Sequence, residues 1–294
     1  MNAYLQTHHR SLIMPKHVDG ATRADTKSST NVATGPIFEV RDLAIGFDER
    51  EDVLHNVTMQ VEPGEFVVLL GPSGCGKTTI LNLAAGLLSP RSGYVRFDGA
   101  EINGVNTNVG YMTQDDTLLP WMPVHANVGL PLRMRGVSKS ETKEKVEYYL
   151  SLLDLSEAGS LFPSQLSGGM RRRALLARSM IYDPRLLLMD EPFAALDAQL
   201  RHQMHVELRR TVKRLQQTVV FVTHDIAEAA KLADRVLIVG GGRPGHLVAE
   251  FQVPYGDDRD LENITYTDEY ARFERELNEG LRSARDPRVT TVRA

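Results

Sequence analysis

The feature of this sequence that most restricts its fold is the stretch GPSGCGKTT at residues 71–79, between the apolar run EFVVLL (65–70) and a helix-like segment, Lys77 to Leu88. It fits Gly-x-x-x-x-Gly-Lys-Ser/Thr, with the strand before and the helix after that this pattern requires. Such glycines let successive backbone N–H groups point at phosphate oxygens, and the following helix adds the positive end of its dipole. The sequence therefore predicts an α/β fold whose loop holds a nucleoside triphosphate, in preference to a glycine-rich turn without a ligand.

Side chains in this loop have separate tasks. Lys77 supplies a point charge for the β- and γ-phosphates, and the Thr78 hydroxyl can ligate Mg²⁺. Cys75 is the only cysteine of the 294 residues, so no internal disulfide can form, which fits a reducing compartment. We expect a bulky adduct on this thiol to obstruct the phosphates, without a catalytic role for the thiol. The residues expected to contact the nucleotide are Gly71, Pro72, Ser73, Gly74, Cys75, Gly76, Lys77, Thr78 and Thr79.

Two adjacent carboxylates end another apolar run, RLLLMDEP at 185–192. Successive strand residues point to opposite sides, so Asp190 and Glu191 cannot share one role. Asp190 suits the outer shell of Mg²⁺, whereas Glu191 is free to polarise a water for attack on the γ-phosphate. Taken alone, the pair could equally be solvated acids at a strand end, but the phosphate-binding loop favours the catalytic interpretation.

Two further polar residues follow predicted strands. His224 comes directly after TVVFVT (218–223), and Gln114 closes NVGYMTQ (108–114). Open parallel sheets bind ligands at the carboxyl ends of their strands, so His224 could reach the γ-phosphate there. Gln114 offers an amide oxygen to the metal or to water. A lone histidine is more often structural, and that alternative stays open.

The segment LSGGM (166–170) places two glycines before the helix-like run RRRALLARSMI. Ser167, Gly168 and Gly169 would form a second helix N-terminus that accepts an anion. One domain holds one nucleotide, so a second phosphate-binding segment is useful only if it binds the nucleotide held by a partner. A plain helix start is the alternative.

Apolar periodicity predicts the organisation of the chain. Half-buried strands are expected at 37–45 and 57–61, a strand at 94–99, and buried strands at 185–190, 218–223 and 235–240. The region from His125 to Met180 is mainly helical, and a capping box at Ser138–Glu141 starts its clearest helix. Strands alternating with helices imply a mostly parallel sheet with a helical insertion. In the acidic tail one helix face, expected to pack on the parent domain, carries Tyr266, Tyr270, Phe273, Leu277 and Leu281.

Composition and charge exclude several functions. A net charge of -4 gives no support for nucleic-acid binding. The longest apolar runs have only strand length, and the N-terminus is no signal peptide, so any membrane role must come through a partner. His202 and His205 have no apparent third metal ligand, so a solvated helix face is favoured over zinc. Arg171–Arg173 likewise indicates a solvated face.

Six motifs follow one another along the chain: GPSGCGKTT, Gln114, LSGGM, LLLMDEP, Ala195-Leu196-Asp197 and His224. In this order they resemble the ATP-binding subunit of an ABC transporter, over about residues 37–250. Finer features, among them TLLPWMPVHANV (117–128) and VTHDIAEAAKLADRV (222–236), resemble the nitrate/sulfonate/taurine importer group. The family usually has Gln where this chain has Met170.

The resemblance implies a P-loop NTPase of ABC ATPase type: a mostly parallel core sheet, an antiparallel β subdomain, and a helical subdomain at about 115–182. A disordered arm (1–36) would precede this domain (37–250), and a helical tail (251–294) would follow it. Two such subunits would form a head-to-tail homodimer that traps ATP between the P-loop of one and LSGGM of the other. The resemblance also implies that Asp197 contacts the opposite subunit and that Phe47 stacks on adenine, with ordinary packing of Phe47 as the alternative. The LSGGM residues facing the opposite ATP would be Leu166, Ser167, Gly168, Gly169 and Met170.

By the same resemblance the chain would hydrolyse ATP with Mg²⁺, using Glu191 and His224. It would sit peripherally on the cytoplasmic face of the cell membrane and energise the permease subunits of an importer, with a solute-binding protein as an indirect partner. The solute could be nitrate, a sulfonate, taurine or a similar small molecule. Gln114 to Trp121 would receive the permease, with local packing as the alternative for Trp121. A soluble ABC-type ATPase acting on ribosomes or DNA is the runner-up, but the chain has one cassette and no sustained heptads. A P-loop kinase leaves LSGGM unexplained.

Overall fold

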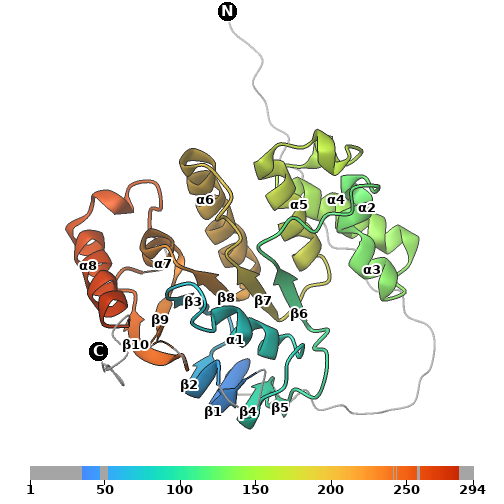
Figure 1. The fold of residues 1–294 in the computed structure, drawn as a ribbon. Coiled ribbons are helices and arrows are strands. Elements are labelled where there is room, and N and C mark those ends of the chain that lie inside the picture. The colour runs from blue at the N-terminus through green and yellow to red at the C-terminus, as the bar shows by residue number, and fades with distance from the viewer. Residues whose placement is uncertain (1–34, 47–51, 241, 243, 257–258, 285–294) are drawn as a thin grey trace, which may run out of the picture. The chain divides into compact units, whose positions relative to one another are not determined.

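The computed structural model describes residues 35–46, 52–240, 242, 244–256 and 259–284. Phe47 and nearly all of the predicted arm lie outside these residues, so the adenine-stacking prediction has no structural counterpart here. Two sheets organise the described chain (Figure 1). The smaller sheet is antiparallel, as predicted, and its strand order is β2-β1-β4-β5. Its strands are β1 (Phe38–Ile45), β2 (Leu54–Val61), β4 (Ser92–Phe97) and β5 (Ala100–Glu101).

The larger sheet has the order β10-β9-β3-β8-β7-β6, and all neighbouring strands are parallel except β10, which runs antiparallel to β9. A mostly parallel core sheet was predicted and is confirmed. Sequence analysis did not find β10, because this edge strand buries few residues and its pairing is irregular between Leu247 and Ala249. The strands are β3 (Phe66–Leu70), β6 (Val109–Met112), β7 (Leu186–Asp190), β8 (Thr218–Thr223), β9 (Arg235–Gly240) and β10 (His246–Gln252).

Both faces of this sheet are buried, which explains the continuous apolar runs of its central strands. In β3, Phe66, Val68 and Leu70 face one hydrophobic core, whereas Val67 and Leu69 face the other. Helix α1 (Lys77–Ala84) and the antiparallel sheet cover the second face. The first face is covered by residues of α5 (Gly168–Met180), α6 (Ala198–Leu215), α7 (Ile226–Leu232) and α8 (Asp268–Ser283).

The chain between β6 and β7 is helical, shown in green and yellow-green in Figure 1. Ser138 is the N-cap of α4, and its hydroxyl accepts from the Glu141 N–H at 3.2 Å, as the predicted cap requires. Within the ranges described, none of the helices has the length and apolar composition needed to cross a membrane. The helical elements are α2 (Val124–Val128), α3 (Leu130–Met134), α4 (Lys139–Leu152), η1 (Ser156–Ala158), η2 (Pro163–Gln165) and α5 (Gly168–Met180).

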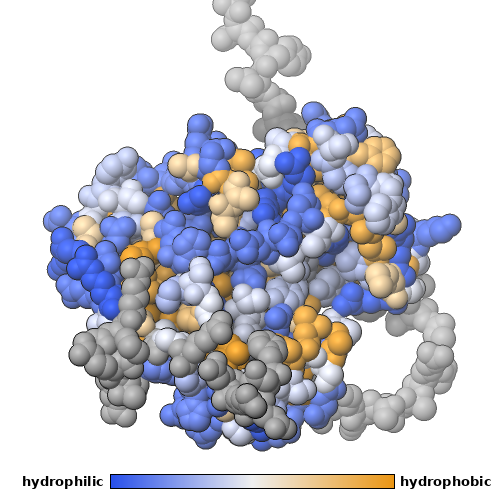
Figure 2. Space-filling model, viewed as in Figure 1, coloured by the Kyte–Doolittle hydropathy of each residue, from blue (hydrophilic) through white to orange (hydrophobic). Residues whose placement is uncertain are grey.

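The tail helix α8 packs on α7, β9 and β10. Tyr270, Phe273, Leu277 and Leu281 are buried on one face, so the expected packing on the parent domain is confirmed. Tyr266 does not share this face and is 86% exposed, because it lies in the turn η3 (Ile264–Tyr266) before the helix begins. The opposite surface of α8 is hydrophilic, whereas exposed hydrophobic residues show among α2–α5 (Figure 2).

Candidate active site

Four of the predicted motifs lie at the carboxyl ends of four neighbouring parallel strands, β3, β8, β7 and β6. Register fixes this arrangement, because Leu70 of β3 pairs with Thr223 of β8, and Val222 pairs with Asp190 of β7. The glycine-rich loop therefore comes next to His224, and His224 comes next to the carboxylate pair. Gln114 follows two residues after β6, the next strand along. Parallel sheets bind ligands at this edge, so the four motifs lie where one ligand could meet them.

Glycines shape the loop at two positions where a side chain has no room. A Cβ on Gly71 would come within 2.2 Å of the Val239 carbonyl oxygen, and one on Gly76 within 2.4 Å of Leu54 Cδ2. Gly76 also has a φ of 102° and is the N-cap of α1, with no side-chain cap. The first N–H groups of α1 therefore remain available to a ligand, as a phosphate-binding helix end requires.

Lys77 is folded into the loop that it follows. Its side chain is buried, and Nζ donates to the carbonyl oxygens of Gly71 and Pro72 at 2.8 Å each. The Cys75 Sγ lies 4.0 Å from Nζ. Burial raises the pKa of the Cys75 thiol, and the Lys77 charge opposes part of that rise. The lysine charge and the thiol thus both lie inside the phosphate-binding loop.

Asp190 and Thr78 bring a carboxylate and a hydroxyl together. Burial raises the pKa of Asp190, a hydrogen bond with the Thr78 side chain lowers it, and the charge of Glu191 raises it. Mg²⁺ prefers oxygen ligands and takes only one or two from the protein beside substrate phosphates and water. This donor set fits Mg²⁺, although the described residues contain no cluster of three or more His, Cys, Asp or Glu side chains that could hold a metal alone.

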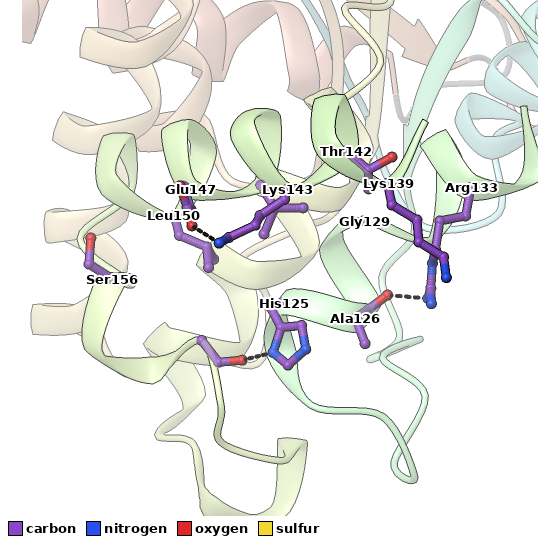
Figure 3. Close-up of a pocket in the computed structure, with 12 residues that line it drawn as sticks. His125, Ala126, Gly129, Arg133, Lys139, Thr142, Lys143, Glu147, Leu150 and Ser156 are labelled. Carbon is purple, nitrogen blue, oxygen red and sulfur yellow. Dashed lines mark hydrogen bonds and ion pairs between the residues drawn. The ribbon is translucent and has the colours of Figure 1, made fainter. Parts of the chain in front are cut away.

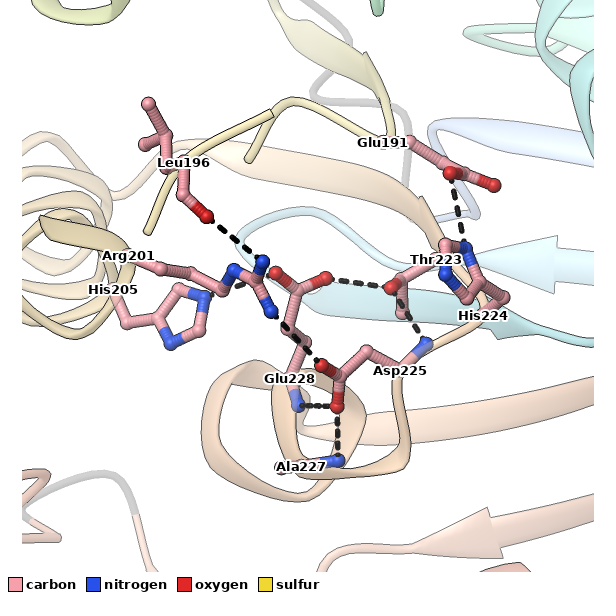
Figure 4. Close-up of polar contacts among 9 residues, drawn as sticks. All are labelled: Glu191, Leu196, Arg201, His205, Thr223, His224, Asp225, Ala227 and Glu228. Atoms are coloured by element: carbon pink, nitrogen blue, oxygen red, sulfur yellow. Dashed lines mark hydrogen bonds and ion pairs between the residues drawn. The ribbon is translucent and has the colours of Figure 1, made fainter. Parts of the chain in front are cut away.

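Glu191 and His224 face each other across the ends of β7 and β8 (Figure 4). Glu191 Oε2 lies 3.0 Å from His224 Nδ1, and their side chains are 17% and 55% exposed. Glu191 has a φ of 43°, in the left-handed region, which costs a non-glycine residue about 1–2 kcal/mol. Its N–H donates to the Val222 carbonyl oxygen at 3.0 Å, which holds the turn. Such backbone strain is concentrated at functional sites.

Gln114 is exposed and is tied to α5 through its backbone. Its carbonyl oxygen accepts from Arg172 at 2.6 Å. Arg172 is buried, so the predicted solvated face was wrong at this residue. Of its neighbours, Arg171 pairs with Asp116 at 3.3 Å and Arg173 with Glu207 at 3.2 Å.

The LSGGM segment starts a helix, as predicted. Ser167 is the N-cap of α5, and its hydroxyl accepts from the Met170 N–H at 3.2 Å. Leu166 and Gly169 are buried, and Gly168 and Met170 are half-buried. Asp197 is likewise an exposed N-cap, of α6, and accepts from the Leu200 N–H at 2.9 Å. Both segments therefore present exposed N-cap side chains.

His205 was missed by sequence reasoning. The expected solvated face was wrong, because His205 is only 4% exposed and its Nε2 lies 3.1 Å from Glu228 Oε1. The signal was available in its spacing, since Met204, Leu208 and Val212 form the buried stripe of α6 beside it. His202 is half-buried.

A hollow of about 510 Å³ lies away from these motifs, between α2, α3 and α4 (Figure 3). His125, Arg133, Lys139 and Lys143 line it, and His125 Nδ1 lies 2.7 Å from the Gly159 carbonyl oxygen. It contains none of the predicted site residues, so it is not the candidate active site.

A glycine-rich loop beside a carboxylate pair and a histidine defines a P-loop nucleotide-binding ATPase. Residues 54–194 match the family model described as "ABC transporter". The nitrate import ATP-binding protein of Synechocystis sp. is 41% identical over 214 residues, which cover 72% of this chain and 80% of that protein. The taurine import ATP-binding protein of Jannaschia sp. is 36% identical over 245 residues, covering 81% and 91%. The chain therefore belongs to the ABC transporter family, and both of these relatives are named as import ATP-binding proteins.

A spermidine/putrescine import ATP-binding protein of Pseudomonas aeruginosa is 43% identical over 219 residues, covering 74% of this chain but only 60% of that protein. A solved dimeric ATP-binding cassette, in a post-hydrolysis state bound to ADP and Pi, superposes with a TM-score of 0.64 and 28% identity. The superposition covers 74% of this chain and 100% of the chain of that cassette. The predicted ABC ATPase fold is confirmed.

Proposed function

We propose that this chain binds and hydrolyses ATP as the energising subunit of an ABC importer. The contact between Glu191 Oε2 and His224 Nδ1 at 3.0 Å, beside the phosphate-binding loop, carries the proposal. It joins a general base to a residue able to contact the γ-phosphate, at the edge of the sheet where the loop begins.

In this function the loop residues Gly71 to Thr79 hold the triphosphate of ATP. When ATP binds, the Lys77 ammonium moves from the loop carbonyls to the β- and γ-phosphates and donates charge-assisted hydrogen bonds to them. Asp190, Thr78 and Gln114 hold Mg²⁺, which neutralises phosphate charge when bound. Glu191 accepts a proton from the attacking water, and His224 orients Glu191 and contacts the γ-phosphate.

Two copies of the chain form the working unit. The exposed N-terminus of α5, with Ser167 and Gly168, offers N–H groups to the ATP held by the other copy. Asp197, exposed at the start of α6, contacts the opposite subunit. The dimeric cassette bound to ADP and Pi supports this arrangement by similarity.

The membrane partner docks on the segment from Gln114 to Trp121. Trp121 is 69% exposed, so it does not take part in the local packing that was its alternative. An exposed tryptophan suits a protein interface, because its large ring contributes much contact area. The permease holds the subunit at the cytoplasmic face of the membrane, and a solute-binding protein delivers the solute. Relatives named for nitrate and taurine import favour a similar small solute, whereas the relative named for spermidine/putrescine import shows that this family also serves cationic solutes.

The variant Glu191→Gln tests the proposal. Without a general base, we expect ATP turnover to fall about 10²–10⁴-fold while ATP binding persists and a stable dimer accumulates. Turnover is measured by phosphate release and the dimer by gel filtration with ATP. Glu147→Gln is the matched control, since Glu147 is exposed on α4 and contacts Lys143. Normal hydrolysis by Glu191→Gln would exclude the role given to Glu191.

A further inference from the structure

A chain of buried polar contacts lies behind His224 (Figure 4). Thr223, the residue before it, donates its hydroxyl to Glu228 Oε2 at 2.5 Å. The same Thr223 oxygen accepts from the N–H of Asp225, the residue after His224, at 3.0 Å. Glu228 therefore holds the backbone on both sides of His224 through one threonine side chain.

The other oxygen of Glu228 is held from α6. His205 Nε2 lies 3.1 Å from Glu228 Oε1, and both side chains are about 95% buried (5% and 6% exposed). A carboxylate only accepts, so Nε2 carries the proton that makes this bond. The His205 ring packs against Phe193, with ring centroids 5.4 Å apart, which fixes its orientation. A buried carboxylate is tolerated only when it is paired in this way.

A second contact from α6 reaches the same segment. Arg201 lies 3.5 Å from Asp225 Oδ2 and donates to the Leu196 carbonyl oxygen at 2.9 Å. Asp225 Oδ1 in turn accepts from the N–H groups of Ala227 and Glu228, at 2.8 and 3.3 Å, and so caps α7. The segment from Thr223 to Asp225 is thus fixed from α6 and α7 together.

We propose that His205 and Glu228 are positioning residues for ATP hydrolysis: they hold the backbone that presents His224 to Glu191. This inference rests on the proposed function. The His224 side chain is 55% exposed, so packing restrains it little and its orientation depends on the backbone that carries it. A displacement of about 1 Å in a catalytic group can lower the rate about 10²-fold. The hydrogen bonds and ring contact of His205 and Glu228 go to each other, Thr223, Asp225 and Phe193 and not to the phosphate-binding loop, so we expect ATP affinity not to depend on them.

His205→Leu tests the inference on the purified full-length chain. We expect kcat for ATP hydrolysis to fall about 10-fold or more, with KM for ATP and the affinity for a fluorescent ATP analogue within about twofold of wild type. His205→Gln keeps an N–H donor within reach of Glu228 and should recover most of kcat. His202→Leu, one turn earlier on the same helix and half-buried, is the control and should leave turnover unchanged.

Combining His205→Leu with Thr223→Val asks whether both act through Glu228. If they do, kcat of the double variant falls by a much smaller factor than the product of the two factors measured for the single variants. Full additivity, wild-type kcat in His205→Leu, or equal loss of kcat, affinity and thermal midpoint without rescue by His205→Gln would overturn the inference. His224→Ala and Glu191→Gln are measured in parallel. If these two also keep wild-type turnover, the proposed function itself fails; if they lose turnover and His205→Leu does not, only the inference fails.

Discussion

Helices α1 and α5 both have glycines at their N-terminal ends, and both ends were predicted to bind phosphate. The two helices are nevertheless capped differently. The N-cap of α1 is Gly76, in the left-handed region with no side-chain cap. The N-cap of α5 is Ser167, in an extended conformation, and its hydroxyl already accepts from the Met170 N–H. The first helix leaves its N-terminal donors for a ligand, whereas the second has one of them satisfied within the chain.

Their surroundings differ as well. Gly76 and Lys77 are buried, and the lysine charge is held inside the loop. At α5, Ser167 is exposed and Gly168 is half-buried. In the proposed function, one chain thus holds phosphate at α1 by itself but offers only an outward-facing helix end at α5. That contrast is what a site completed by a second copy of the chain requires.

The largest expected effect is a difference in ATP affinity between the variants Gly76→Ala and Gly169→Ala. At Gly76 the new Cβ meets the buried Leu54 at 2.4 Å and the φ of 102° is strained, so we expect about 1–3 kcal/mol of destabilisation and loss of ATP binding. At Gly169 the backbone is helical and needs no positive φ, and the nearest atoms to the new Cβ belong to the Leu200 side chain, with Cδ1 at 2.7 Å. ATP affinity of that variant should stay unchanged. Titration with a fluorescent ATP analogue measures the affinity of each variant, and thermal unfolding measures its stability. Equal losses of affinity in the two variants would remove the contrast between the two helices.

Ser167→Ala should have a smaller and more selective effect. Loss of an N-cap costs about 1 kcal/mol of stability. Affinity for ATP at α1 should be unchanged, while ATP-dependent dimerisation and turnover fall. Ser138→Ala is a matched control, because Ser138 caps α4 with the same 3.2 Å contact. The control should show the same stability loss with normal turnover, whereas equal turnover in both variants would contradict a role for α5 in the dimer.

The sequence was informative where a signal is local. The runs of β3, β7, β8 and β9 are continuous and apolar because both sheet faces are covered, so their ends and the residues that follow could be placed. The strand order that makes Asp190, Glu191 and His224 neighbours is not local, but parallel strands share one edge for ligands, which was enough to group them.

What could not be predicted depends on partners far apart in the sequence. The partner of the buried His205 is Glu228, 23 residues later, which accepts a hydrogen bond from Nε2, and the partner of the buried Arg172 is the Gln114 carbonyl, 58 residues earlier. A charged or polar residue on a helix indicates solvent unless such a partner is known. Tyr266 has the right spacing for the α8 face but precedes its N-cap, Thr267, so periodicity alone extended the helix too far.

The smallest effect is a change in the labelling rate of Cys75, which reports on α1 alone because the chain has no second cysteine. The thiol is 4% exposed, and burial raises its pKa, so the reactive thiolate is scarcer at neutral pH than in an exposed cysteine. Maleimide labelling should therefore be slow, speed up as pH rises, and slow further with ATP. A Cβ added at Gly245 would lie only 2.2 Å from the Cys75 carbonyl oxygen, so the backbone packs closely behind the loop. The loop therefore has little room to move, and a completed adduct should abolish ATP binding. Mass spectrometry follows the labelling, with urea-unfolded chain as the fast reference. Full labelling with unchanged ATP binding would show that this thiol does not lie in the phosphate cradle.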